Sequence, residues 1–365
     1  MKVKYDIGII GGGQLGQMMA IEAKKMGKTV AALDPNPKCP ASLVCDKIIV
    51  GSYSDLDKLK ELGEITNVLS YEFENVPGET LIHLDKTYNI PQGINILLDS
   101  QDRLSEKMNA QRHGLKTARF KDCSSLIDLK NAIKEFGYPC IYKTRREGYD
   151  GHGQVVLRSE NDIELVKPYL DSVLGIVEEF IDFDYEVSII MIRNEDKIIH
   201  FPISRNIHKD GILDICYVSE SEQEKYKDLI SASYNFMRSA NYMGILTIEY
   251  FIKDNDFYFN EMAPRPHNSG HYTIEGCNTN QFKELDKFLL NLDLETPKLK
   301  KDTIMKNILG RDLCNLEKLK LIPNASVHMY GKDEVRMLRK LGHITYVGLN
   351  LHEFINYLKK LNIEE

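Results

Sequence analysis

The hydrophobic positions at the start of the chain fall into a strand, a helix and a second strand. Tyr5–Ile10 is a short apolar run that ends at the glycine turn Gly11–Gly13. Gln14–Lys25 then carries apolar residues at helical spacing, and Thr29–Leu33 is a second apolar run that ends at Asp34. Because β and α segments alternate, the pattern predicts a parallel sheet in an α/β domain.

A later strand of the same sheet is predicted at Val68–Ser70, and the polar segment YEFENVP follows it at residues 71–77. Ligands of open α/β sheets bind beyond the carboxyl ends of the strands, so this segment is a candidate binding edge.

The middle of the chain alternates between short strands and helices, and a small terminal part follows Thr296-Pro297. We therefore predict three domains, at residues 1–100, 101–295 and 296–365. The elements expected in the last two are helices at Asp102–His113, Phe282–Asn291 and Leu351–Leu361, and strands at Tyr138–Thr144, Gln154–Arg158, Val173–Ile181, Glu186–Arg193, Gly244–Ile252 and Phe257–Met262.

Composition narrows the class of protein. Of the 365 residues, 42% are hydrophobic and 28% charged, which is typical of a soluble globular chain. A net charge of −7 argues against broad binding to nucleic acid, which needs a basic face. Seven scattered Cys without a C-x-x-C pair indicate reduced thiols in the cytoplasm. The amino terminus does not resemble a signal peptide, and no apolar run approaches the roughly 20 residues of a membrane span.

The glycine turn has the spacing Gly11-x-Gly13-x-x-Gly16 between a strand and a helix. Such a turn lets backbone N–H groups approach an anion at a helix N-terminus. With Asp34 at the distance of a ribose-binding acid, the motif alone suggests an NAD enzyme. A purely structural turn is the alternative.

A second glycine-rich segment, RREGYDGHGQ at residues 145–154, lies between two predicted strands. A loop with many free N–H donors can close over a triphosphate and exclude water. Lys143 directly precedes it in an apolar strand, where its amine either reaches solvent or meets a phosphate. The adjacent loop favours the phosphate.

Glu249 and Glu261 lie in the two arms of a predicted hairpin. If the turn is centred on Asn255, the two residues are directly opposite, with Cβ atoms about 4.5–5.5 Å apart. Opposed like charges destabilise a sheet unless something neutralises them, and Mg²⁺ takes carboxylate oxygens together with substrate phosphates. The alternatives are a slipped register that leaves one Glu solvated, or a shared proton.

The loop APRPHNSGH at 263–271 follows the second arm and can present donors to an anion. His267 and His271 have a spacing that suits zinc, but the segment is a loop without a third obvious ligand. His208 lies in the segment SRNIH, and a histidine there is more often a surface residue than a catalytic one.

Taken in order, these segments resemble the 5-(carboxyamino)imidazole ribonucleotide synthases of the ATP-grasp superfamily. The resemblance also rests on GIIGGGQLGQM, EVSIIMIR and VHMYGKDEVRMLRKLGH, and it covers nearly the whole chain. It implies a Rossmann-like pre-ATP-grasp domain, a central ATP-grasp domain with a mobile β lid at about 120–180, and a small C-terminal domain. It also implies a homodimer.

The resemblance implies a reaction and a set of site residues. ATP, Mg²⁺ and bicarbonate carboxylate 5-aminoimidazole ribonucleotide through carboxyphosphate, in purine biosynthesis. The ATP-binding residues implied are Arg103, Lys143, Gly148, Tyr149, Asp150, Gly151, His152, Gly153, Gln154, Glu178, Glu179, Phe180, Ile181, Glu186, His208, Asn260 and Glu261. The ribonucleotide-binding residues implied are Gly13, Gln14, Leu15, Glu72, Glu74, Arg265, His267, Asn268, Ser269, Lys332 and Arg339. Glu249 and Glu261 hold the metal, and Lys143, His208 and Arg265 act in catalysis.

One departure from the family pattern concerns the glycine-rich loop. His152 stands where Lys or Arg is usual, and Glu147 stands where Gly is common. The resemblance therefore does not specify the affinity of this loop for phosphate or its pH dependence, although it does specify the reaction class.

Three other functions fit parts of the sequence. A formate-dependent glycinamide ribonucleotide transformylase shares the superfamily and differs in its substrates. An NAD-dependent oxidoreductase accounts for the glycine turn but not for the opposed glutamates. A non-catalytic nucleotide-binding module conflicts with the intact acidic pair.

Overall fold

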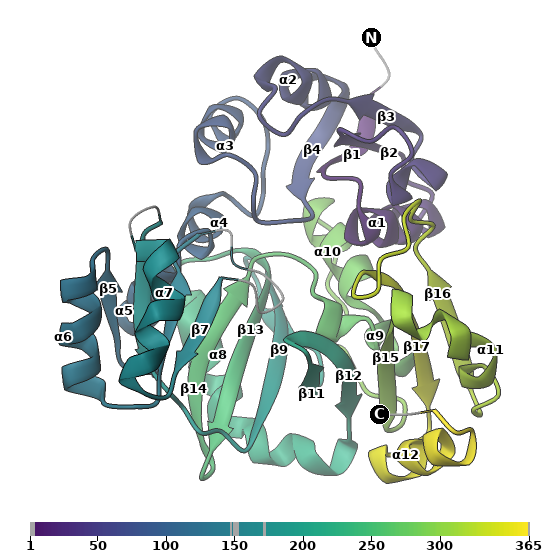
Figure 1. Cartoon of the computed structure of the whole chain (residues 1–365). Helices are drawn as coiled ribbons and strands as arrows, with labels where there is room; N and C mark the ends of the chain where they lie inside the picture. Colours follow the sequence, from purple (N-terminus) through teal and green to yellow (C-terminus); the bar gives the residue numbers. More distant parts are fainter. Residues whose placement is uncertain (1–3, 147, 149–152, 171–172, 364–365) are drawn as a thin grey trace.

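The computed structural model describes residues 4–146, 148, 153–170 and 173–363, and they form three sheets (Figure 1). The first is the predicted parallel sheet at the amino terminus, with strand order β3-β2-β1-β4. Its strands are β1 (Tyr5–Ile10), β2 (Val30–Asp34), β3 (Lys47–Val50) and β4 (Thr66–Tyr71). Its helices are α1 (Gln14–Lys25), α2 (Leu56–Ile65), α3 (Gly78–Asp85) and the short α4 (Asn95–Ser100).

The second sheet has four antiparallel strands in the order β5-β8-β6-β7. They are β5 (Phe120–Cys123), β6 (Cys140–Thr144), β7 (Gln154–Leu157) and β8 (Gly175–Glu179). Helices α6 (Leu126–Phe136) and α7 (Ile163–Leu170) share one apolar core with it, so the sheet is buried on one face. The sheet occupies the span in which the lid was predicted.

The third sheet is the largest and runs through the centre of the molecule, in the order β14-β13-β9-β11-β12-β15-β17-β16, with β10 paired to β9. Its strands are β9 (Tyr185–Arg193), β10 (Ile198–His200), β11 (Ser204–Lys209), β12 (Ile212–Val218), β13 (Gly244–Lys253), β14 (Asp256–Ala263), β15 (Thr303–Leu309), β16 (Ala325–Met329) and β17 (Lys340–Val347). The accompanying helices are α5 (Arg103–Arg112), α8 (Lys227–Ser239), α9 (Thr273–Gly276), α10 (Gln281–Leu289), α11 (Leu316–Leu319) and α12 (Leu351–Lys360).

The terminal strands extend this central sheet and do not form a sheet of their own. Ile215 and Cys216 of β12 pair with Lys306 and Met305 of β15, which then pairs with β17. The boundary predicted at residue 296 therefore runs through one continuous sheet, which the strand pattern of single segments does not reveal. The amino-terminal sheet also shares a core with this part, because helix α1 packs on α10 and Tyr330 joins the same apolar cluster.

None of the described helices is long and apolar enough to cross a membrane.

Candidate active site

A cavity of about 620 Å³ opens where the three sheets meet. Its walls bring together residues that lie as much as 326 positions apart in the sequence, from Gln14 to Lys340. The predicted site residues that line it are Gln14, Leu15, Glu72, Glu74, Arg103, Lys143, Gly148, Gln154, Glu186, His208, Glu249, Asn260, Glu261, Arg265, His267 and Asn268. Predicted residues that the structure describes but that do not line it are Gly13, Gly153, Glu178, Glu179, Phe180, Ile181, Ser269, Lys332 and Arg339. Tyr149, Asp150, Gly151 and His152, like Glu147, lie outside the described residues.

The β13–β14 hairpin confirms that Glu249 and Glu261 are directly opposite, but the predicted turn was wrong. The turn consists of two residues, Asp254 and Asn255, both with positive φ. Asp and Asn tolerate that conformation and favour such tight hairpins. The pairing next to this turn would place Glu249 opposite Asn260. A one-residue β-bulge beyond Tyr250 shifts the register and brings Glu261 opposite instead.

The side chains of the two glutamates have different partners. Glu249 is 6% exposed and accepts a hydrogen bond from Ser188 Oγ at 3.1 Å. Glu261 has 43% of its side chain exposed and lies 3.4 Å from Arg103 Nη1. The opposed pair therefore has a buried member and a member at the cavity surface, which already faces a cation.

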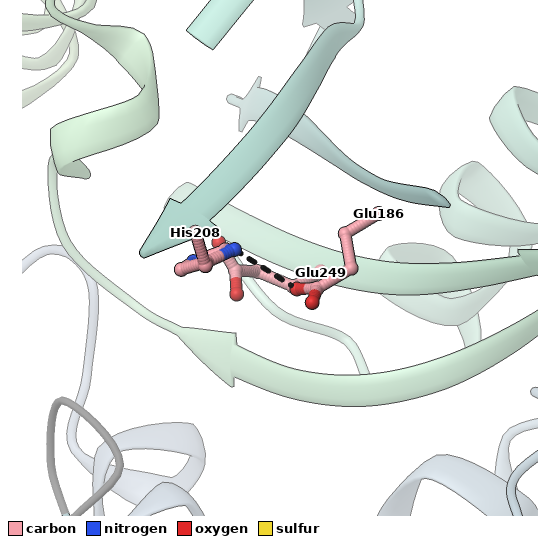
Figure 2. Close-up of side chains that lie close together, drawn as sticks. All are labelled: Glu186, His208 and Glu249. Atoms are coloured by element: carbon pink, nitrogen blue, oxygen red, sulfur yellow. Dashed lines mark ion pairs between the residues drawn. The ribbon is translucent and has the colours of Figure 1, made fainter. Parts of the chain in front are cut away.

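Glu249 is the centre of an acidic cluster with Glu186 of β9 and His208 of β11 (Figure 2). One donor atom from each lies within 4.8 Å of the others, and His208 Nδ1 is 3.4 Å from Glu186 Oε2. Among the described residues this is the one group of three or more metal-ligating side chains. The predicted zinc alternative at His267 and His271 has no such group.

Burial and mutual repulsion govern the ionisation of the cluster. Burial, with the charges of Glu261 and Glu186, raises the pKa of Glu249 well above its ordinary value. Burial and the charge of Glu261 also raise the pKa of Glu186 to about 7. A divalent cation would relieve both effects, because it neutralises converging carboxylates. The oxygen donors of Glu249, Glu261 and Glu186 fit Mg²⁺, which prefers carboxylates and phosphates.

The opposite wall of the cavity is cationic. Lys143 Nζ on β6 and Lys107 Nζ on α5 lie 3.1 Å and 3.2 Å from the same oxygen, Oε2 of Glu178 on β8. Burial alone would raise the pKa of Glu178, but the two lysines lower it to about 2. Glu178 belongs to the segment 178–181 that the resemblance assigns to ATP, and in the structure its carboxylate neutralises two buried lysines.

Helix α5 connects this wall to the acidic hairpin. Glu106 accepts a hydrogen bond from the N–H of Met262 at 2.6 Å, and Lys107 Nζ donates to the carbonyl of Asn260 at 3.3 Å. Burial and the charge of Glu261 raise the pKa of Glu106 to about 8. Sequence analysis selected only Arg103 from this helix. The missed signal is the run of ionisable residues at 102, 103, 106 and 107, which share one helical face.

The glycine turn at the start of α1 already holds an anionic group of the protein itself. Glu72 accepts hydrogen bonds from the N–H groups of Gly13 and Gly16, the latter at 2.6 Å. A Cβ on Gly13 would lie 2.6 Å from Glu72 Oε1, so this approach requires glycine. Asp34 accepts from the N–H of Gly12 at 2.8 Å and from Tyr53 Oη at 2.7 Å. The N-terminus that a dinucleotide phosphate would need is filled, which removes the NAD interpretation.

The loop after β14 is held by side-chain hydrogen bonds. Arg265 pairs with Glu74 through two bonds, one of them Nη2 to Oε1 at 2.8 Å. His267 Nδ1 contacts Ser269 Oγ at 2.8 Å and lies 3.7 Å from Glu249 Oε1. Asn268 exchanges amide hydrogen bonds with Asn307 of β15. Arg265, His267 and Asn268 thus face the cavity, whereas Ser269 is fully buried beneath it.

The structure does not place Lys332 and Arg339 in the cavity. Lys332 Nζ lies 5.5 Å from the ring centroid of Tyr330, and Arg339 Nη1 donates to the carbonyl of Glu334 at 3.2 Å. The next residue, Lys340, lines the cavity instead. It is the first residue of β17, so strand geometry directs it inward while the preceding loop remains at the rim.

The three-sheet arrangement and its two-sided cavity define the class of protein as an ATP-grasp enzyme. Residues 108–282 match the ATP-grasp domain model, residues 4–98 the ribonucleotide synthetase preATP-grasp domain, and residues 303–356 the phosphoribosylaminoimidazole carboxylase C-terminal domain.

Full-length relatives define the family. An N5-carboxyaminoimidazole ribonucleotide synthase from Staphylococcus haemolyticus is 43% identical over 365 residues, covering 96% of this chain and 96% of the relative. The crystal structure of N5-carboxyaminoimidazole synthetase from Staphylococcus aureus complexed with ADP has a TM-score of 0.94 at 37% identity, covering 99% of this chain and 98% of that one. The Aspergillus clavatus enzyme in complex with ADP and 5-aminoimidazole ribonucleotide has a TM-score of 0.89 at 26% identity, covering 99% and 98%. The chain belongs to the N5-carboxyaminoimidazole ribonucleotide synthase family.

Proposed function

We propose that this enzyme uses ATP and bicarbonate to carboxylate the exocyclic amine of 5-aminoimidazole ribonucleotide, in purine biosynthesis. The observation that carries the proposal is that one cavity has both the acidic cluster around Glu249 and the cations Lys143 and Arg103 in its lining. Phosphoryl transfer depends mainly on charge neutralisation and in-line positioning, and these two walls supply both charges.

The proposed chemistry has two steps. A bicarbonate oxygen attacks the γ-phosphorus, the bond to the β–γ bridging oxygen breaks, and ADP leaves as carboxyphosphate forms. The amine of the ribonucleotide then attacks the carboxyl carbon, or CO₂ released from carboxyphosphate, while phosphate leaves and the nitrogen loses a proton. Because carboxyphosphate hydrolyses readily, the second step needs a closed site without bulk water.

We assign the ATP phosphates to Arg103, Lys143 and the glycine-rich loop, with His208 near the γ-phosphate. Mg²⁺ would be held by Glu249 and Glu261 and would neutralise phosphate charge during transfer. The ribonucleotide would bind between the glycine turn and Arg265. In this arrangement Glu72 holds the glycine turn and Glu74 holds Arg265. That Lys332 and Arg339 bind the 5′-phosphate of the ribonucleotide remains a prediction.

Three further assignments remain proposals. The domain boundaries at 100 and 295 follow the order of the elements predicted along the chain, and the lid at about 120–180 follows from the resemblance to the family. A homodimer follows from the resemblance to the family. A cytoplasmic location is supported by the seven cysteines, all of which are free thiols.

The test is ADP release measured with each substrate omitted in turn. Release should require bicarbonate, Mg²⁺ and 5-aminoimidazole ribonucleotide together. The alternative within the superfamily is a formate-dependent glycinamide ribonucleotide transformylase, so formate and glycinamide ribonucleotide form the comparison arm. Equal turnover with that pair would overturn the proposal.

A further inference from the structure

The four-stranded sheet is fixed to helix α5 by an ion pair that none of the predicted site residues includes. Asp102, the N-cap of α5, is 3% exposed and contacts Arg145, which directly follows β6. Arg145 Nε lies 3.0 Å and 3.1 Å from the two carboxylate oxygens of Asp102, and Nη2 lies 2.8 Å from Oδ2. Arg146 Nε is 3.3 Å from the same Oδ2. A bidentate pair of this kind fixes orientation as well as distance.

Asp102 and Arg145 each make further hydrogen bonds, Asp102 within α5 and Arg145 with the four-stranded sheet. The Asp102 carboxylate accepts hydrogen bonds from the N–H groups of Leu104 and Ser105, which anchors it to the first turn of α5. Arg145 Nη1 lies 3.3 Å from Asp122 Oδ1 on β5. Arg145 therefore connects the second sheet to the helix, and the N–H of Arg103 donates to the Arg145 carbonyl at 2.9 Å beside it.

The Asp102–Arg145 pair lies next to two cations of the cavity lining. Asp102 immediately precedes Arg103, and Arg145 lies two residues beyond Lys143. Arg103 and Lys143 line the same cavity but belong to different bodies, the helix and the four-stranded sheet. This junction, together with the contacts of Lys107 and Lys143 with Glu178, thus sets the spacing between the two cations assigned to ATP.

We propose that Asp102 is a positioning residue for the ATP step, acting through Arg145 on the relative placement of Arg103 and Lys143. The inference rests on the proposed function, because it needs both cations to bind ATP phosphates. Asp102 does not line the cavity itself. It acts by fixing the relative positions of Arg103 and Lys143, which do line the cavity.

The competing explanation is that Asp102 merely caps a helix. Asp102→Asn separates the two roles, since Asn is as good an N-cap as Asp but removes the charge that Arg145 needs. Asp55→Asn is the matched control: Asp55 is the N-cap of α2, accepts from Lys58 N–H at 3.1 Å and lies outside the cavity lining. Arg145→Gln and the Asp102→Asn/Arg145→Gln double variant complete a double-mutant cycle.

The experiment measures steady-state ADP release and calorimetric binding of ADP with Mg²⁺ for all five proteins. We expect Asp102→Asn to raise the KM for ATP and the Kd for ADP about tenfold or more, because a charge-assisted bond is lost. The KM for the ribonucleotide should stay unchanged, and Asp55→Asn should match wild type. Arg145→Gln should add little in the Asp102→Asn background, since coupled residues are not additive.

Two results would overturn the inference: wild-type ATP and ADP affinity in Asp102→Asn, or independent, multiplicative effects of the two substitutions. A wild-type enzyme that releases no ADP with bicarbonate and the ribonucleotide would instead disprove the proposed function. The calorimetric arm still reports on the positioning role in that case.

Discussion

Two buried glutamates, Glu249 in the lining of the cavity and Glu178 behind Lys143, have opposite electrostatic surroundings. Glu178 lies between Lys107 and Lys143, which lower its pKa to about 2. Glu249 lies among Glu261, Glu186 and His208, and its pKa is raised well above the ordinary value. The same side chain is thus kept ionised by two lysines in one place and lies among acidic groups that favour its protonated form in the other.

At Glu178 the protein itself supplies the opposite charges, whereas at Glu249 a bound cation would have to supply them. Glu178 is paired with charges of the protein itself, and its Oε2 holds two lysines in place. A buried cluster of like charges is costly to keep, and it persists where function requires it. The contrast predicts that substitutions of Glu178 act on stability and that substitutions of Glu249 act on catalysis.

The largest effect is expected from Glu249→Gln. The variant should lower kcat by several orders of magnitude, because the carboxylate that neutralises transferring charge through the metal is lost. The fold should remain intact, since Gln has nearly the same size and burial already disfavours the charged form of Glu249. The measurements are kcat at saturating Mg²⁺ and the urea midpoint. Near-normal turnover would remove Glu249 from the metal site.

Glu178→Gln should act mainly on folding stability, whereas Glu249→Gln acts mainly on kcat. Two buried lysines then lose their shared partner, and removal of one member of a buried pair costs about 3–5 kcal/mol of folding stability. Urea unfolding measures this loss, with Glu179→Gln as the neighbouring control whose carboxylate instead pairs with the exposed Arg119. If the Glu178 and Glu179 variants are equally stable, the pairing does not support the fold.

In a third buried site the side chains that contact the two buried histidines are neutral: Gln281 contacts His271 and Tyr330 contacts His343. His271 and His343 are fully buried with ring centroids 4.7 Å apart, and His328 stacks on His343 at 4.6 Å. Burial, with the charges of His328, Lys340, Arg265 and Lys332, lowers the pKa of His271 to about 3. Burial and the charges of His271 and His328 also lower the pKa of His343.

The smallest effect follows from this third site. Since His271 is neutral when folded and has a pKa near 6.5 when unfolded, its contribution to stability is present above pH 6.5. That contribution is lost as the pH falls from 6.5 towards 3. The slope is about 1.4 kcal/mol per pH unit for each such histidine. His271→Gln should therefore flatten the fall in unfolding free energy between pH 6.5 and 5. An unchanged slope would show that His271 is charged in the folded state.

The sequence predicted what depends on local pattern. Strand β1, helix α1 and the acidic hairpin were found because period and turn residues specify them. The pairing of Glu249 with Glu261 was correct although the turn was not, because the bulge compensated for a one-residue difference. The spacing of residues along the sequence does not reveal such a bulge.

What the sequence did not predict depends on contacts between distant segments. Glu186 and His208 join Glu249 only because β9 separates β13 from β11 in the central sheet. Glu72 fills the glycine turn from a strand 59 residues away. Arg339 and Lys340 differ in direction because β17 begins between them. No single segment specifies these arrangements, since each depends on which strands are neighbours.

The central claim is that the cluster around Glu249 is built for a cation that the nucleotide brings, and calorimetric titration of ADP with and without Mg²⁺ tests it most directly. Wild type should bind ADP at least tenfold more tightly with Mg²⁺ present. Glu249→Gln should abolish that difference while leaving metal-free ADP binding unchanged. Retention of the full Mg²⁺ effect in Glu249→Gln would contradict the account.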